Sequence, residues 1–130
     1  MKEKELRLAL VCYGGVSLAV YMHGVTKEIL KLVRASRDRN SDSPAERGDI
    51  RDSEDVYAEL LAALEPELDL RVVVDIIAGA SAGGINGVIL GRALAHDLDL
   101  DPVRAFWLTH TDVTELMNDQ VQAKPWHKIL

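Results

Sequence analysis

The sequence is poor in cysteine and in aromatic residues. Cys12 is the only cysteine among 130 residues, so no disulfide bond can form within the chain. Aromatic residues make up only 5% of the chain, so a core built from its 48% hydrophobic content must be mainly aliphatic. Cys12 lies in an apolar run and is expected to be a small core residue. A single cysteine suits a reducing compartment, so the expected location is the cytoplasm. Membrane association of the complete protein is left open.

The sequence also lacks an excess of positive charge. Its 15 Lys and Arg residues face 21 Asp and Glu residues, which gives a formal net charge of −6. Nucleic acids and anionic membrane surfaces attract basic proteins. We therefore expect no nucleic-acid partner and no general electrostatic attraction to anionic membranes.

One long uncharged run, residues 8–26, has the length of a signal peptide or a membrane span. The residues before it include Glu3 and Glu5, which make a poor positive leader region. A glycine pair interrupts the run, and a helical pattern continues past Lys27. We therefore expect neither a leader peptide nor a membrane span here, and the length of the chain leaves room for one domain at most.

The most informative motif is Gly-Ala-Ser-Ala-Gly-Gly at residues 79–84, directly after the apolar run 71–78. A Gly-x-Ser-x-Gly motif between a strand and a helix places the serine on a sharp turn, beside the first amides of the helix. Glycine suits the flanks, here Gly79, Gly83 and Gly84, because a side chain in so tight a turn would collide with backbone. Ser81 is therefore the candidate nucleophile, and the alternative is an ordinary turn of small residues.

A second strand–glycine–helix unit lies near the N-terminus. Residues 6–12 predict a buried strand, and apolar residues at three- and four-residue steps predict a helix from Leu18 to Val33. In a parallel sheet both turns emerge at the carboxyl edge, where open α/β sheets bind their ligands. Gly14 and Gly15 would then present backbone N–H groups to an oxyanion. An ordinary tight turn is the alternative for this glycine pair.

These units predict an α/β fold in which the strands near residues 6–12 and 71–78 are parallel and adjacent. The density of charged and turn residues predicts a mobile loop over residues 34–55. Short helices are expected over residues 56–64 and from Asp101 onward.

Glycines recur every four residues in the helix after the serine, at positions 83, 87 and 91. Each costs roughly 1 kcal/mol against alanine in a helix interior. The repeat therefore predicts a close backbone approach to a neighbouring element.

Together the two glycine turns resemble the N-terminal part of a patatin-like phospholipase domain, in the branch of bacterial patatin-related proteins. In this resemblance Gly14-Gly15-Val16-Ser17 matches the glycine-rich oxyanion element, and residues 79–84 match the nucleophile elbow. The resemblance implies a three-layer α/β sandwich with a mainly parallel sheet, of which residues 1–130 form the N-terminal portion. It also implies a lipid acyl hydrolase with a Ser-Asp dyad, a lipid or acyl-ester substrate, a peripheral membrane contact, and no metal or other cofactor.

The sequence departs from the family pattern in two places. The family's oxyanion element usually continues Gly-Gly-x-Arg-Gly, whereas Ser17 and Leu18 occupy the last two positions here. The family's catalytic aspartate precedes a glycine downstream of the serine, and this sequence contains no Asp-Gly dipeptide. We therefore expect the aspartate beyond residue 130, and the first departure leaves open whether the complete protein is active.

Three other functions remain open. A Ser-His-Asp hydrolase would use His96, His110 or His127, but no convincing strand separates these from Ser81. A nucleotide-binding module would need a glycine where Ile85 stands, or a lysine after the glycines. The third alternative is a patatin-like interaction domain that has lost its chemistry.

Overall fold

The computed structural model describes residues 2–38 and 52–110. A long N-terminal strand leads through a short 3-10 helix into the longest helix, and a second helix–strand–helix–helix series follows. In chain order the elements are β1 (Lys2–Cys12), η1 (Val16–Leu18), α1 (Ala19–Asp38), α2 (Ser53–Leu64), β2 (Leu68–Gly79), α3 (Ala82–His96) and α4 (Asp101–His110).

The two strands form a parallel pair, as the sequence predicts. Their register runs from Lys2 beside Leu68 to Cys12 beside Gly79, with one irregularity where β2 accommodates the extra residue Asp75. Both strands therefore end at the same edge of the sheet, and each leads from there through glycines into a helix.

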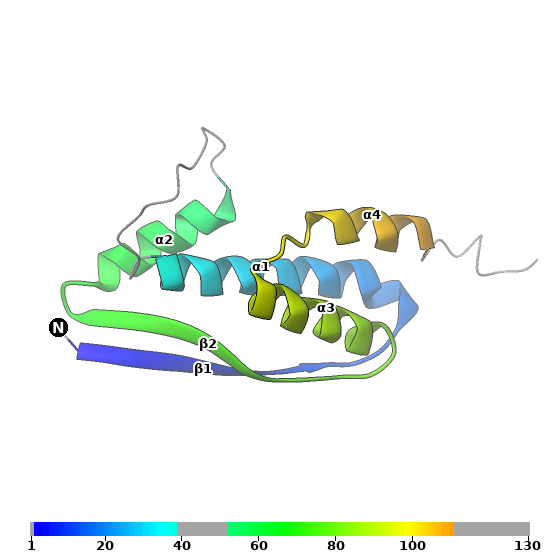
Figure 1. Cartoon of the computed structure of the whole chain (residues 1–130), viewed down its shortest axis with the longest axis horizontal. Coiled ribbons are helices and arrows are strands. Elements are labelled where there is room, and N and C mark those ends of the chain that lie inside the picture. The colour runs from blue at the N-terminus through cyan, green and yellow to red at the C-terminus, as the bar shows by residue number, and fades with distance from the viewer. Residues whose placement is uncertain (1, 39–51, 111–130) are drawn as a thin grey trace, which may run out of the picture.

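The described residues form two layers, where the resemblance implies three. Figure 1 shows the four helices on one face of the sheet. In residues 2–38 and 52–110 no helix covers the other face, where Val11 and Ile76 are exposed and Arg7 pairs with Asp75. The structure is thus mixed α/β with a two-stranded parallel sheet, and the described residues contain no third layer.

The core lies between the sheet and the helices, and it is aliphatic as the composition predicts. Leu30 of α1, Leu90 of α3 and Leu100 before α4 are almost completely buried, and Leu10 and Ile77 of the sheet pack against them. A second cluster, near the C-terminal edge of the sheet, joins the start of α1 to α3 and α4 through Ala19, Ala82 and Trp107.

The prediction of a loop over residues 34–55 is wrong at both of its ends. Helix α1 continues into this range, where Arg34 and Arg37 both bind the carboxylate of Asp97 at the end of α3. Helix α2 begins before the range ends, because Asp52 caps it and also accepts a hydrogen bond from Lys31. That hydrogen bond lowers the pKa of Asp52. The charged residues that suggested a solvated loop are in part helix anchors, and residues 39–51 lie outside the described residues.

The prediction of close approach at the glycine repeat is confirmed at two of its three positions. A Cβ atom added at Gly83 would lie 2.2 Å from the carbonyl oxygen of Cys12, and one at Gly87 would lie 2.8 Å from Ile77 Cγ2. At Gly91 the nearest atom would be 3.8 Å away, which is an ordinary contact. Helix α3 therefore lies against the end of the sheet where both strands terminate.

Candidate active site

Ser81 occupies the turn between β2 and α3 in an unusual backbone conformation. Its φ is 53° and its ψ is −129°. Among the described residues only Ser81 and Asp97 combine a side chain with a positive φ. Such conformations cost about 1–3 kcal/mol and concentrate at functional sites. The Ser81 side chain is exposed and makes no capping hydrogen bond to α3, so its hydroxyl is available for chemistry.

The glycines around Ser81 make this turn sterically feasible. A Cβ atom at Gly79 would lie 2.6 Å from the carbonyl oxygen of Gly83, and one at Gly84 would lie 3.2 Å from the carbonyl oxygen of Gly79. Two hydrogen bonds fix the turn, from the Ala80 N–H to the Cys12 carbonyl and from the Gly83 N–H to the Ala80 carbonyl. The sequence therefore identified the residues that permit the strained serine.

The N-terminal glycine turn lies directly against Ser81. A Cβ atom added at Gly14 would be 2.7 Å from Ser81 Cβ and 2.8 Å from the carbonyl oxygen of Ala80. Gly15 has a φ of 141°, and its carbonyl accepts a hydrogen bond from the Leu18 N–H that closes the turn. Val16 begins the 3-10 helix that follows. The structure thus brings together the two motifs that the sequence predicted to meet.

Three backbone N–H groups beside Ser81 have no partner within the described residues. They belong to Gly14, Gly15 and Ala82, and Ala82 is the first residue of α3. The sequence analysis named the first two and placed the first amides of the helix beside the serine, but it did not name Ala82 as an oxyanion donor. The positive end of the α3 dipole lies at the same place. This turn can therefore stabilise a negative charge that develops next to Ser81 Oγ.

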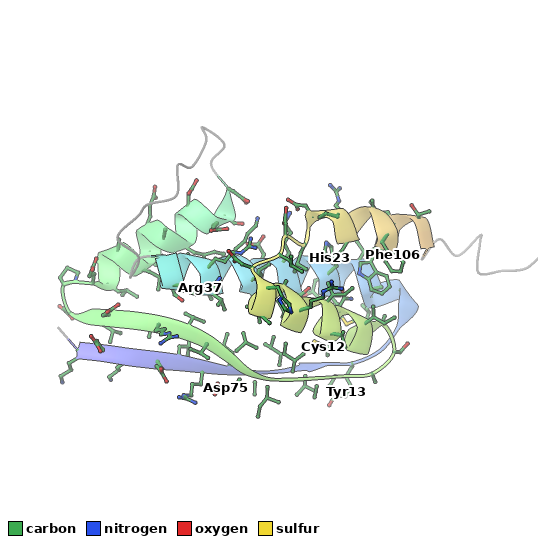
Figure 2. All side chains as sticks on the ribbon, viewed as in Figure 1. Cys12, Tyr13, His23, Arg37, Asp75 and Phe106 are labelled. Carbon is green, nitrogen blue, oxygen red and sulfur yellow. The ribbon has the colours of Figure 1, made fainter. Side chains whose placement is uncertain are left out.

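No hydrogen bond within residues 2–38 and 52–110 joins Ser81 to a carboxylate or an imidazole. Asp75 lies six residues earlier on β2, about 20 Å along the strand, and pairs with Arg7 on the helix-free face (Figure 2). Asp97 lies at the opposite end of α3, about 22 Å from the elbow, where it binds two arginines. Asp101 pairs with Lys27. These aspartates therefore serve structural contacts.

The histidines of the described region also lie apart from Ser81. His96 ends α3, a full helix length from the elbow. His23 of α1 is 4% exposed, and neither of its ring nitrogens has a hydrogen-bond partner within the described residues. The His110 side chain and His127 lie outside the description. The histidine triad thus gains no support from the residues that the structure describes.

His23 lies among the helices (Figure 2), where its side chain is buried. Burial lowers the pKa of its imidazole, and the neighbouring charges of Lys27 and Arg104 lower it further, against an opposing effect of Asp101. His23 is therefore neutral in the folded protein at neutral pH. An unfolded chain restores the ordinary histidine pKa of about 6.5.

This environment predicts that the protein loses stability as the pH falls through about 6.5. Because the pKa of His23 is lower in the folded state, the unfolded state binds more protons in this range, and folding opposes its protonation. The free energy of unfolding should fall by at most about 1.4 kcal/mol per pH unit, and this pH dependence should vanish above pH 7.5. Urea unfolding midpoints between pH 5.5 and 7.5 should show the slope in the wild type and not in His23→Leu. The exposed His96→Gln is the matched control, and an unchanged slope in His23→Leu would contradict the assignment.

Within residues 2–38 and 52–110, no group of three His, Cys, Asp or Glu side chains could hold a metal ion. None of the described helices combines the length and the apolarity that crossing a membrane requires.

The chain is similar to a curated protein of Mycobacterium tuberculosis. The uncharacterized membrane protein Rv3479 is 40% identical to it over 117 residues, which is 89% of this chain and 11% of that protein. The chain thus spans about a tenth of the length of this relative. No family model matches the sequence, and no solved structure matches it.

Proposed function

We propose that this chain carries the nucleophile and the oxyanion turn of a patatin-like, serine-dependent lipid acyl hydrolase. The observation that supports this function best is the meeting of two turns. Ser81, with a positive φ and an unbonded hydroxyl, lies against a glycine turn whose amides have no partner within the described residues. Each turn alone has a structural explanation, and acyl transfer needs both at one place.

In the proposed reaction Ser81 Oγ attacks the carbonyl carbon of an ester, and its proton passes to an aspartate base. The negative charge on the carbonyl oxygen is stabilised by the amides of Gly14, Gly15 and Ala82. Collapse of this intermediate releases the alcohol, which takes up the proton, and leaves an acyl group on the serine. Water activated by the same base then hydrolyses the acyl-enzyme. Because a serine hydroxyl is a weak nucleophile without a base, the aspartate of the complete protein is essential to this proposal.

The surroundings of the glycine turn favour an apolar acyl substrate. A cavity of about 330 Å³ lies between β1 and α1, beginning at Tyr13 and Leu18 beside the turn and continuing along Tyr21 and Val25. These four side chains are also exposed at the surface. We propose that this apolar surface makes a peripheral membrane contact in the complete protein, and the relative named a membrane protein is consistent with it.

A non-catalytic patatin-like interaction domain is the second candidate. It is favoured by Ser17 and Leu18, which replace the arginine and glycine of the family's oxyanion element, and by the absence of a carboxylate bonded to Ser81 in the described region. The two candidate functions make different predictions: the complete protein hydrolyses esters if it is a hydrolase and does not if it is an interaction domain.

The experiment compares p-nitrophenyl butyrate hydrolysis by the complete protein and by residues 1–130 alone. We expect turnover by the complete protein and only background hydrolysis by the shorter chain, because its sequence contains no Asp-Gly pair to supply the proposed base. Circular dichroism establishes that both are folded. Robust turnover by residues 1–130 would place the base within them and favour the histidine triad. A folded complete protein inactive on esters of every chain length would favour the interaction domain.

A further inference from the structure

A single buried amide side chain connects the elbow to the glycine turn. Asn86 of α3 is 1% exposed and lies one helical turn after the elbow. Its Nδ2 donates hydrogen bonds to the carbonyl oxygens of Ala19 and Ala82, at 3.2 and 3.1 Å. Its Oδ1 accepts a hydrogen bond from Trp107 Nε1 at 3.0 Å. Every polar atom of this side chain is therefore bonded within the core.

The partners of Asn86 lie at the ends of the elements that form the candidate site. Ala82 directly follows Ser81, and Ala19 begins α1 directly after the short 3-10 helix that leaves the glycine turn. Trp107 belongs to α4, which packs over the start of α1. Asn86 thus joins the element that carries the nucleophile to the element that follows the oxyanion turn. Neither the elbow motif nor the glycine turn includes it.

We propose that Asn86 is a positioning residue that sets the distance between Ser81 and the amides of Gly14 and Gly15. This inference rests on the proposed function. Oxyanion donors must lie within hydrogen-bond distance of the charge that develops, and a displacement of about 1 Å can lower the rate about 100-fold. Apolar packing alone leaves α3 free to slide along α1. The hydrogen bond from Asn86 Nδ2 to the Ala19 carbonyl crosses from α3 to α1 and opposes that sliding, because breaking it leaves a buried N–H group unpaired. The bond to Ala82 lies within α3 and holds the amide in the orientation that reaches Ala19.

Two substitutions test the donor group and the acceptor group of the Asn86 side chain separately. Asn86→Asp keeps the shape and the acceptor for Trp107, but it places an oxygen against the carbonyls of Ala19 and Ala82. Trp107→Phe removes the indole N–H and keeps both donations from Asn86. Leu61→Ala is the matched control for a general loss of stability, since Leu61 is 2% exposed and lies in α2.

In the complete protein, Asn86→Asp is expected to lower kcat for p-nitrophenyl butyrate about 100-fold with KM little changed. Labelling of Ser81 by a fluorophosphonate should slow by a similar factor. Trp107→Phe and Leu61→Ala should keep kcat within a few-fold of the wild type. Where Asn86→Asp does not fold, Asn86→Ser carries the same expectation, because its hydroxyl is too short to bridge both carbonyls.

Hydrogen exchange supplies a readout that does not depend on activity. Asn86→Asp should speed amide exchange in residues 13–20 and 79–86 together, whereas Leu61→Ala should speed it near α2. If the wild type does not hydrolyse esters but Asn86→Asp still shows this faster exchange, the proposed function is overturned and the structural link through Asn86 is retained. Unchanged kcat and unchanged exchange in the Asn86 variants would contradict the positioning role of Asn86. If Leu61→Ala loses as much kcat as Asn86→Asp, the effect of Asn86 comes from general stability and not from positioning.

Discussion

Replacing Ser81 with alanine is expected to abolish ester hydrolysis by the complete protein. In the proposed mechanism the substitution removes the atom that forms the acyl-enzyme bond, and loss of a serine nucleophile lowers kcat on the order of 10⁶-fold. The fold should survive, because serine and alanine both carry a Cβ atom and therefore bear the same strain at a φ of 53°. Ser81 also makes no capping bond whose loss would destabilise α3.

The measurement combines turnover of p-nitrophenyl butyrate with fluorophosphonate labelling, followed by mapping of the labelled peptide. Wild-type protein should be labelled at Ser81, and Ser81→Ala should not be labelled. Ser53→Ala is a suitable control, since Ser53 bonds to Lys31 and Glu28 at the start of α2, away from the elbow. Labelling or turnover that persists in a folded Ser81→Ala protein would move the nucleophile elsewhere and leave the elbow as a structural turn.

A methyl group at Gly83 is expected to disrupt the junction between the sheet and α3. The added carbon would lie 2.2 Å from the Cys12 carbonyl oxygen and 2.9 Å from that of Tyr13, both of them backbone atoms. Alanine has a higher helix propensity than glycine by roughly 1 kcal/mol, but this steric conflict is larger. We expect a loss of about 3 kcal/mol or more in Gly83→Ala. The melting temperature should fall by about 10 °C or more.

Gly24→Ala is the matched control, because it makes the same change within α1. Apart from the adjacent residues and the local helix backbone, no atom of the described residues lies within 4 Å of a Cβ added at Gly24. The gain in helix propensity then remains, and the melting temperature should rise by about 2–4 °C. Equal melting temperatures for the two variants would show that Gly83 is not confined by β1. A marked loss in Gly24→Ala would show that another segment approaches α1 there.

Much of the fold follows from local sequence patterns. The apolar runs before residues 14 and 79 predict the strands, and the glycines after each run predict that both strands end at one edge. Parallel pairing then follows, and the register from Lys2 beside Leu68 confirms it. The first strand starts earlier than predicted, since its charged first residues gain pairing from β2 that no local pattern reveals. The three-layer arrangement rested on the resemblance, and the helices of the described residues cover one face only.

The parts that sequence analysis missed depend on contacts between distant residues. Arg34 and Arg37 appeared to belong to a solvated loop, because their partner Asp97 is some sixty positions away. The sequence analysis did not single out Asn86, because its partners Ala19 and Trp107 lie on other helices. In the candidate site, Ser81 and the glycines carry a motif, and the residue that connects the two turns does not. A motif records local backbone requirements, whereas such a connection exists only after folding.

The pairing of β1 with β2 also sets the order in which the candidate site can form during synthesis. The partner of each β1 residue is made more than sixty residues later, which is about 3–13 s at ordinary translation rates. During this interval the side chains of Leu8 and Leu10 have no sheet partner and no covering helix α3. The Cys12 carbonyl that binds Ala80 belongs to the same strand. The hydrogen bond that fixes the Ser81 turn to β1 can therefore form only after β1 has paired with β2, so the candidate nucleophile is not in place until both strands have been made.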